Sequence, residues 1–163
     1  MRANPMRSLT DDWLPEFDFG LMSHGFVPHG RDYQFVLEAR GTYELMLTHV
    51  VDLHVETRVM DDVWPMSWDD VFTDYAAWEA AGHPQGYVWG SYGSLAYPGL
   101  IAPDDDPAAQ RWSERLGKPM FAMSIETDRF KIAAIFHGAR ARKLSEDNPY
   151  IRAVIRPLGL PQP

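Results

Sequence analysis

The sequence predicts a single α+β domain, in which an antiparallel sheet of about five or six strands carries two short helices packed on one face. Two observations lead to this prediction. Apolar and polar residues alternate through several segments, as they do in strands with one buried face. Two other segments place apolar residues at helical spacing between helix start and stop signals. We expect a polar segment over residues 1–16, the domain over 17–144 and a basic, proline-containing tail over 145–163.

The first strands are expected before residue 60. Residues 17–27 alternate roughly and end in turn chemistry, and residues 32–38 alternate more cleanly. Residues 42–59 then form a long or bulged antiparallel strand. His49 falls in its apolar series and His54 in its polar series, so the two side chains should face opposite sides of the sheet.

Two helices are expected from their boundaries. Residues 67–81 begin with a capping-box-like Ser67, and apolar residues follow at helical spacing. Residues 106–116 begin with Asp106 as N-cap before a proline and end at Gly117. Both segments are short enough to lie across a small sheet.

The remaining strands are expected after residue 85. Residues 86–100 mix glycines with aromatic residues, which suits either a bent strand or a loop. Residues 120–126 and 130–136 alternate on either side of a short polar turn, which predicts a hairpin.

The composition excludes several classes of site and partner. Of the 163 residues 45% are hydrophobic and none is Cys, which rules out disulfides, thiolate nucleophiles, Cys-based zinc sites and iron–sulfur clusters. The formal net charge of −8 disfavours nucleic acid and favours a cationic partner. No apolar run follows the arginines near the start, so we expect a cytoplasmic protein without a signal peptide or membrane anchor.

Common catalytic signatures do not occur in the sequence. No Ser lies in a Gly-x-Ser-x-Gly elbow, and the glycines have neither the Rossmann nor the Walker spacing. The three consecutive carboxylates of residues 104–106 are explained better by capping of the following helix than by a Mg²⁺ or Ca²⁺ site. We therefore expect no catalytic residue, no metal, no cofactor and a non-enzymatic role.

Seven short motifs occur in a fixed order along the chain. They are His24-Gly25-Phe26, Arg31-Asp32-Tyr33, Gly86-Tyr87-Val88-Trp89-Gly90, Tyr97-Pro98-Gly99, Arg111-Trp112-Ser113, Leu116-Gly117 and Ile125-Glu126-Thr127. As a set they resemble the YxiG-like family of small bacterial proteins, over roughly residues 17–144. The resemblance implies no agreed catalytic residue that could be carried over. It also implies that some members are encoded near polymorphic-toxin loci, where small acidic proteins often act as immunity factors.

The densest group of ionisable side chains surrounds the first turn and consists of His24, His29, Arg31 and Asp32. Two imidazoles near a carboxylate could bind a divalent metal or a small molecule, with His137 as a distant further ligand. The alternative is that Arg31 and Asp32 fix the turn as an ion pair while His24 satisfies backbone carbonyls. We keep this alternative ligand site as the second hypothesis.

The leading hypothesis is an interaction protein, plausibly an immunity-type inhibitor that covers a basic toxin or nuclease. Aromatic anchors beside carboxylates suit a basic protein partner, and the densest such cluster is Asp61, Asp62, Trp64, Asp69 and Asp70. A solvated acidic face is the alternative explanation.

The end of the chain is basic, through Arg140, Arg142, Lys143, Arg152 and Arg156. Such a segment could contact the phosphates of a nucleic acid. We expect instead that it folds back onto the protein's own acidic surface, so a nucleic-acid partner is not the favoured interpretation.

Overall fold

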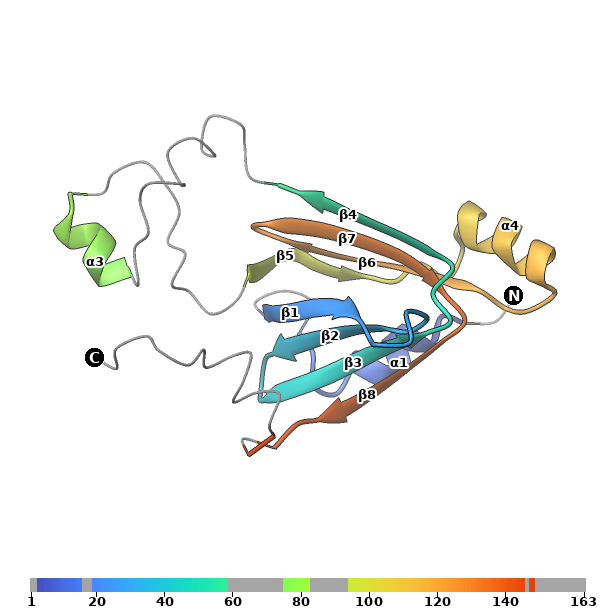
Figure 1. The fold of residues 1–163 in the computed structure, drawn as a ribbon, viewed down its shortest axis with the longest axis horizontal. Coiled ribbons are helices and arrows are strands. Elements are labelled where there is room, and N and C mark those ends of the chain that lie inside the picture. Colours follow the sequence, from blue (N-terminus) through green and yellow to red (C-terminus); the bar gives the residue numbers. More distant parts are fainter. Residues whose placement is uncertain (1–2, 16–18, 59–74, 83–93, 146, 149–163) are drawn as a thin grey trace.

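Eight strands and three helices make up the part of the chain that the computed structural model describes, which is residues 3–15, 19–58, 75–82, 94–145 and 147–148 (Figure 1). In chain order they are α1 (Pro5–Thr10), β1 (Gly20–Phe26), β2 (Tyr33–Glu38), β3 (Thr42–Thr48), β4 (Asp52–Thr57), α3 (Tyr75–Ala80), β5 (Ser94–Ile101), α4 (Pro107–Leu116), β6 (Phe121–Thr127), β7 (Phe130–Phe136) and β8 (Gly138–Lys143).

The strands pair in the order β4-β7-β6-β5-β1-β2-β3-β8, and each pairing is antiparallel. They form two sheets of four strands. We call the sheet of β1, β2, β3 and β8 half A, and the sheet of β4, β5, β6 and β7 half B. The α+β class is therefore confirmed, whereas the prediction of one sheet of five or six strands is wrong.

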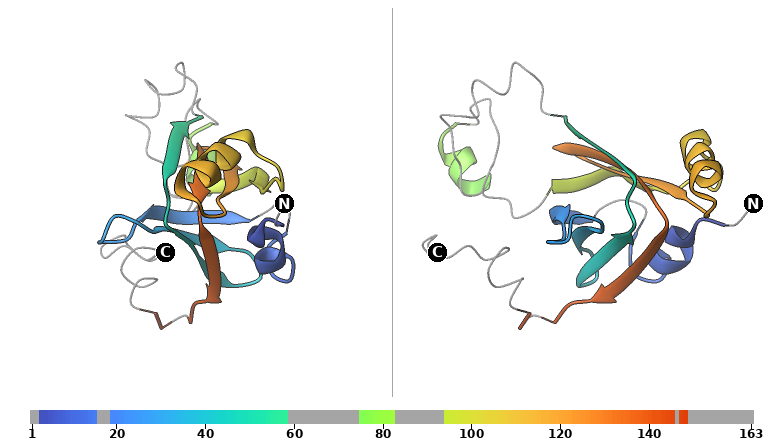
Figure 2. Two further views of the ribbon diagram at one scale, coloured as in Figure 1. Left: turned by 90° about the vertical axis from the view of Figure 1, so that its right-hand side faces the viewer. Right: turned by 45° about the vertical axis from the view of Figure 1, so that its right-hand side comes forward.

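Two long bent strands, which pair with each other, run from one half into the other. β3 continues into β4, and β7 continues into β8, so both strands bend between the halves and stay paired on either side of the bend (Figure 2). We call this bend the corner. Thr48 pairs with Gly138 and Asp52 with Ile135, which leaves one more residue on the β3–β4 side of the corner. His49 takes a left-handed conformation there, with φ +53°. A bulge of this kind bends a strand sharply, and it confirms the expectation of a long or bulged strand.

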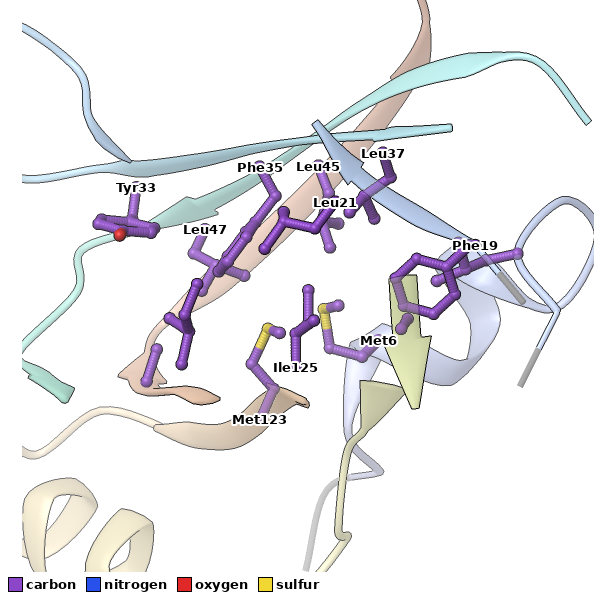
Figure 3. Packing of buried hydrophobic residues seen from close by; sticks show 14 of the residues in the cluster. Met6, Phe19, Leu21, Tyr33, Phe35, Leu37, Leu45, Leu47, Met123 and Ile125 are labelled. Atoms are coloured by element: carbon purple, nitrogen blue, oxygen red, sulfur yellow. The ribbon is translucent and has the colours of Figure 1, made fainter. Parts of the chain in front are cut away.

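The core lies between the two halves. Half A supplies Phe35, Leu45 and Leu47, and half B supplies Ile125 and Ile132, all fully buried (Figure 3). These side chains come from alternate positions of their strands, as burial of one sheet face requires. Hydrophobic burial between the halves is the main stabilising term of the fold.

The polar segment expected over residues 1–16 is folded where the structure describes it. Asn4 caps α1 by accepting a hydrogen bond from the Met6 N–H, and Pro5 occupies the first helical turn. The Met6 side chain is fully buried in the core between the halves. This described part of the segment therefore belongs to the same folded unit as the strands.

The two helices predicted over 67–81 and 106–116 do not share one face of a sheet, which corrects that part of the prediction. α4 packs Ala109 on the outer face of half B against Ala122 and Ile135, whereas α3, the described part of the other predicted helix, lies apart from both halves (Figure 1). α1 inserts Met6 between the halves. The expected boundaries of α4 are confirmed, because Asp106 caps the Ala109 N–H at 2.9 Å and Gly117 ends the helix with φ +63°. α3 falls within the helix expected over 67–81, of which residues 67–74 lie outside the described residues.

The hairpin of β6 and β7 is confirmed. The buried hydroxyl oxygen of Thr127 accepts hydrogen bonds from the Arg129 and Phe130 N–H groups at 3.2 and 2.9 Å and so closes the turn. Within the ambiguous segment 86–100, β5 begins at Ser94, and residues 83–93 lie outside the described residues. None of the helices among the described residues has the length and apolar character needed to cross a membrane.

Candidate functional site

The residues proposed from the sequence fall into three groups in the structure. Asp61, Asp62, Trp64, Asp69 and Asp70 lie outside the described residues. His24 is separated from the other members of the turn cluster, which are His29, Arg31 and Asp32.

His24 lies on β1 and faces the space between the two halves. Its Nδ1 is 2.6 Å from the hydroxyl oxygen of Tyr33 on β2, and its ring meets the Phe130 ring edge-on at 5.3 Å between centroids. Phe130 belongs to half B, so the imidazole bridges the two halves. Phe26, which is half exposed, packs against Tyr33 and adds a further aromatic ring beside this pair.

Burial fixes the protonation of this pair. It lowers the pKa of His24 below the ordinary value of 6.5 and raises the pKa of Tyr33 above 10.0. Near neutral pH the imidazole is therefore neutral and the phenol keeps its proton. A neutral imidazole and a phenol among aromatic rings can exchange hydrogen bonds with a small polar molecule.

Asp32 organises the turn and the neighbouring corner. Its Oδ1 accepts a hydrogen bond from the His49 N–H at 3.0 Å, which holds the residue with the left-handed conformation. His29 Nε2 lies 3.6 Å from Asp32 Oδ2, and Arg31 Nε lies 3.7 Å from Asp32 Oδ1. Because the Asp32 side chain is buried and His49 depends on it, this geometry supports the interpretation in which Arg31 and Asp32 fix the turn.

His49 and His137 face each other at the corner, with ring centroids 5.8 Å apart. His137 Nδ1 donates to the Pro119 carbonyl at 2.7 Å, whereas the buried Nδ1 of His49 has no hydrogen-bond partner among the described residues. Across the described ranges, no three His, Asp or Glu side chains gather where they could hold a metal ion. His24, His29, Asp32 and His137 therefore do not form one ligand set.

Tyr33, His49 and Phe130 complete these clusters, and the sequence alone predicts a functional role for none of them. Tyr33 reaches His24 because Phe26 and Tyr33 are paired in the β1–β2 register. A histidine in the apolar series of a strand was the available signal for His49. Nothing in the sequence indicates that Phe130 would meet His24 across the core.

Half B presents an exposed edge at β4. Among the described strands only β7 pairs with β4, and five of its six residues are exposed. Asp52, His54 and Glu56 alternate along its outer face. His54 Nε2 lies 3.8 Å from Glu56 Oε2, and within the described part of the chain neither Asp52 nor Glu56 has a Lys or Arg partner.

A shallow hollow adjoins this edge on the outer face of half B. Its volume is about 340 Å³, and its lining includes the small residues Ser124 and Ala133. Asp52 of β4, Asp106 at the start of α4 and Lys131 of β7 also line it. The hollow therefore carries charges of both signs.

The carboxylates of residues 104–106 serve the start of α4 and the N-terminal segment. Asp104 accepts from the Asn4 N–H at 3.0 Å, Asp105 accepts from Gln110, and Asp106 caps the helix. The capping interpretation of this run is confirmed for Asp106.

Comparison with known proteins gives one match. The family described as YxiG-like protein matches residues 2–153, a range that includes α1 and extends beyond the motifs that carry the resemblance. No curated protein and no solved structure matches the chain significantly.

Proposed function

We propose that this chain, which belongs to the YxiG-like protein family, is a non-enzymatic interaction protein that binds a basic protein partner. In this proposal it acts as an immunity-type inhibitor, which masks the cationic surface of a toxin or nuclease. Its own acidic and aromatic side chains would supply the contact. Electrostatic attraction would speed the encounter, and the aromatic side chains would hold the complex.

The observation that carries the proposal is the concentration of charge in residues 59–74. This segment holds five Asp residues and no Lys or Arg, against a net charge of −8 for the whole chain. It also contains Trp64 and Trp68. Carboxylates that steer and tryptophans that anchor are the combination expected of a surface for a basic protein.

The described neighbourhood of this segment supports the proposal. In the sequence, the segment comes after Arg58, the residue that follows β4. The Arg58 N–H donates a hydrogen bond of 2.7 Å to the Arg129 carbonyl, which holds the end of β4 next to β7. The exposed carboxylates of Asp52 and Glu56 on β4 extend the negative charge onto half B. A basic partner that approached β4 would meet these two carboxylates.

The test compares two matched double variants. Asp61→Asn/Asp62→Asn removes two charges from the proposed surface, and Asp11→Asn/Asp12→Asn removes two exposed charges after α1. Both are used to capture proteins from the native lysate over a salt series. We expect the wild type and the Asp11/Asp12 control to retain one basic protein that rising salt releases, and the Asp61/Asp62 variant to lose at least tenfold in its affinity at low salt.

Trp64→Ala tests the anchor separately. It should raise the dissociation rate with little change in the association rate, because a buried aromatic contact acts after the encounter. Equal capture by all variants, or a complex that salt does not weaken, would refute the proposed surface.

A second candidate function is binding of a small molecule beside His24. The specific observation that favours it is the neutral His24–Tyr33 pair among the rings of Phe26 and Phe130. Screening of small polar aromatic compounds by NMR should shift the His24 ring signals in the wild type but not in the Tyr33→Phe variant. Elemental analysis of protein purified without a His tag tests the metal alternative, and less than about 0.1 metal per chain would reject it.

A further inference from the structure

β4 has an unused set of backbone hydrogen-bonding groups along its outer edge. The Arg58 N–H donates to the Arg129 carbonyl of the β7 side, and the register pairs Glu56 with Lys131 and His54 with Ala133. Because these groups alternate in direction along an antiparallel strand, the N–H and C=O groups of Leu53, Val55 and Thr57 point away from β7. Figure 1 shows β4 along the upper margin of the described strands.

We propose that β4 pairs with β4 of a second copy of this chain, antiparallel, with the two Val55 residues opposite each other on a two-fold axis. In this register, a residue on one side of Val55 faces the residue that lies equally far on the other side of Val55 in the second copy. The backbone N–H and C=O of Val55 then form hydrogen bonds with the C=O and N–H of Val55 in the second copy. Leu53 forms the same two hydrogen bonds with Thr57 of the second copy. Val55 is 43% exposed in the single chain, so pairing covers apolar surface as well.

The charges favour this register. On the outer face it sets Asp52 opposite Arg58 of the second copy, and His54 opposite Glu56 of the second copy. Each of these pairs occurs twice because the axis is two-fold. Opposite charges in directly facing cross-strand positions stabilise a sheet, whereas like charges there destabilise it.

The neighbouring registers bring like charges together. Centring the pair on His54 sets Asp52 against Glu56 of the second copy, twice. Centring it on Glu56 sets the two Glu56 carboxylates against each other and His54 against Arg58. Of these three registers, only the one centred on Val55 brings no like charges together.

The other free edge does not offer a self-complementary alternative. β8 carries Arg140, Arg142 and Lys143 in six residues, and two copies would bring these cations together. Pairing of β4 with β8 of a second copy would leave one β4 and one β8 unpaired at the ends and would add further copies. The two-fold pairing of β4 instead stops at a dimer.

The contact is small, because each copy contributes a strand of six residues. Specific interfaces of this size lie at the weak end of the known range, so we expect a dimer that forms between about 10 µM and about 500 µM. Sedimentation equilibrium of the full chain over that range measures it. The inference does not depend on the proposed function, because no other protein is present in the measurement.

Charge exchange tests the register. Asp52→Arg sets two pairs of arginines against each other, and Arg58→Asp sets two pairs of aspartates against each other, so each variant alone should dimerise at least tenfold more weakly. A mixture of the two restores both opposite-charge pairs and should recover the wild-type dissociation constant within about threefold. Asp11→Arg, which makes the same change of charge at an exposed position outside β4, should dimerise as the wild type does.

Arg58 also contacts Glu126 within its own chain at 3.2 Å, so the unfolding midpoint of each variant is measured alongside. The mixture keeps the proposal testable even if Arg58→Asp lowers stability, since only cross-copy contact lets one variant rescue the other. A wild type that stays monomeric up to about 0.5 mM would overturn the proposal. So would a dimer that Asp52→Arg leaves unchanged, a mixture without recovery, or growth beyond the dimer.

Discussion

The two halves of the sheet treat their charges differently. In half A the buried carboxylate of Glu44 accepts two hydrogen bonds from Arg142, at 2.8 and 2.9 Å, and one from Gln34 at 2.7 Å. These three residues lie on the adjacent strands β2, β3 and β8. Two parallel hydrogen bonds from one guanidinium to one carboxylate are among the strong polar contacts of proteins.

Half B leaves charges at its edge. Glu126 pairs with both Arg58 and Lys131 at 3.2 Å, but Asp52 and Glu56 of β4 have no such cation among the described residues. Half A therefore uses charged side chains to hold neighbouring strands together, whereas in half B the two carboxylates of β4 have no Lys or Arg partner among the described residues. Substitutions in half A and at the corner should therefore cost stability, and those on β4 should cost association.

The largest loss of stability is expected from Asp32→Ala at the corner that joins the halves. Without the carboxylate, the His49 N–H loses its acceptor while the left-handed conformation remains. Loss of a hydrogen bond to a charged group should lower the free energy of unfolding by about 2–3 kcal/mol, measured by urea denaturation. Asp32→Asn keeps an oxygen acceptor and should lose less. A loss below about 0.5 kcal/mol for Asp32→Ala would show that the contact between Asp32 and His49 does not stabilise the corner.

Arg142→Ala should have the next largest effect. It leaves the buried Glu44 carboxylate with Gln34 as its side-chain partner and should lower the free energy of unfolding by about 1–2 kcal/mol, since the guanidinium is largely exposed. Arg140→Ala, at an exposed position on the same strand, is the matched control and should change stability by less than about 0.5 kcal/mol. Equal losses for the two variants would show that half A does not depend on this contact.

The His24–Tyr33 pair should make stability depend on pH. Because burial lowers the pKa of His24 in the folded chain, the unfolded chain binds a proton in a pH range where the folded chain does not. The neutral His24 therefore contributes its full stability above about pH 6.5, and the free energy of unfolding decreases as the pH falls from there towards the lower pKa of the folded chain. Denaturation at pH 7.5 and 5.5 should show the decrease, and His24→Gln should reduce it.

Tyr33→Phe tests the hydrogen bond between His24 and Tyr33 by removing the Tyr33 hydroxyl. The His24 Nδ1 then loses its partner, and we expect a loss of about 1 kcal/mol in the free energy of unfolding. A stability equal to that of the wild type would show that the two atoms do not exchange a hydrogen bond in solution.

The smallest effect on stability is expected from Asp52→Asn and Glu56→Gln on β4. Both side chains are exposed, so each substitution should change the free energy of unfolding by less than about 0.5 kcal/mol. The same variants should nevertheless weaken association through β4. A loss above 1 kcal/mol would mean that half B uses these charges internally, as half A does.

Local signals explain what the sequence predicts correctly. Asp106 before a proline and Gly117 at the end mark α4, and alternation marks the β6–β7 hairpin, because each signal acts within a few residues. Asn4 followed by Pro5 is the same kind of signal for α1. This signal does not indicate that Met6 is buried, because the burial of Met6 depends on strands distant in the sequence.

Contacts between distant residues explain the rest. The basic end is expected to fold back onto the acidic surface of the chain, and Arg142 does meet Glu44 across 98 positions, but the sequence does not indicate that Arg142 lies on a strand, β8. The corner depends on the contact of Asp32 with His49, and the His24 cluster depends on Phe130 from the other half. Alternation shows which face of a strand is buried, but it does not show that a sheet bends into two halves.

Amide hydrogen exchange by NMR tests most directly whether the chain associates through the β4 edge rather than through the β8 edge. The amides of Leu53, Val55 and Thr57 should exchange quickly at about 10 µM and become protected as the protein concentration rises to about 500 µM, while β8 amides stay unchanged. Unchanged β4 amides over this range, or protection that appears on β8 instead, would contradict the account.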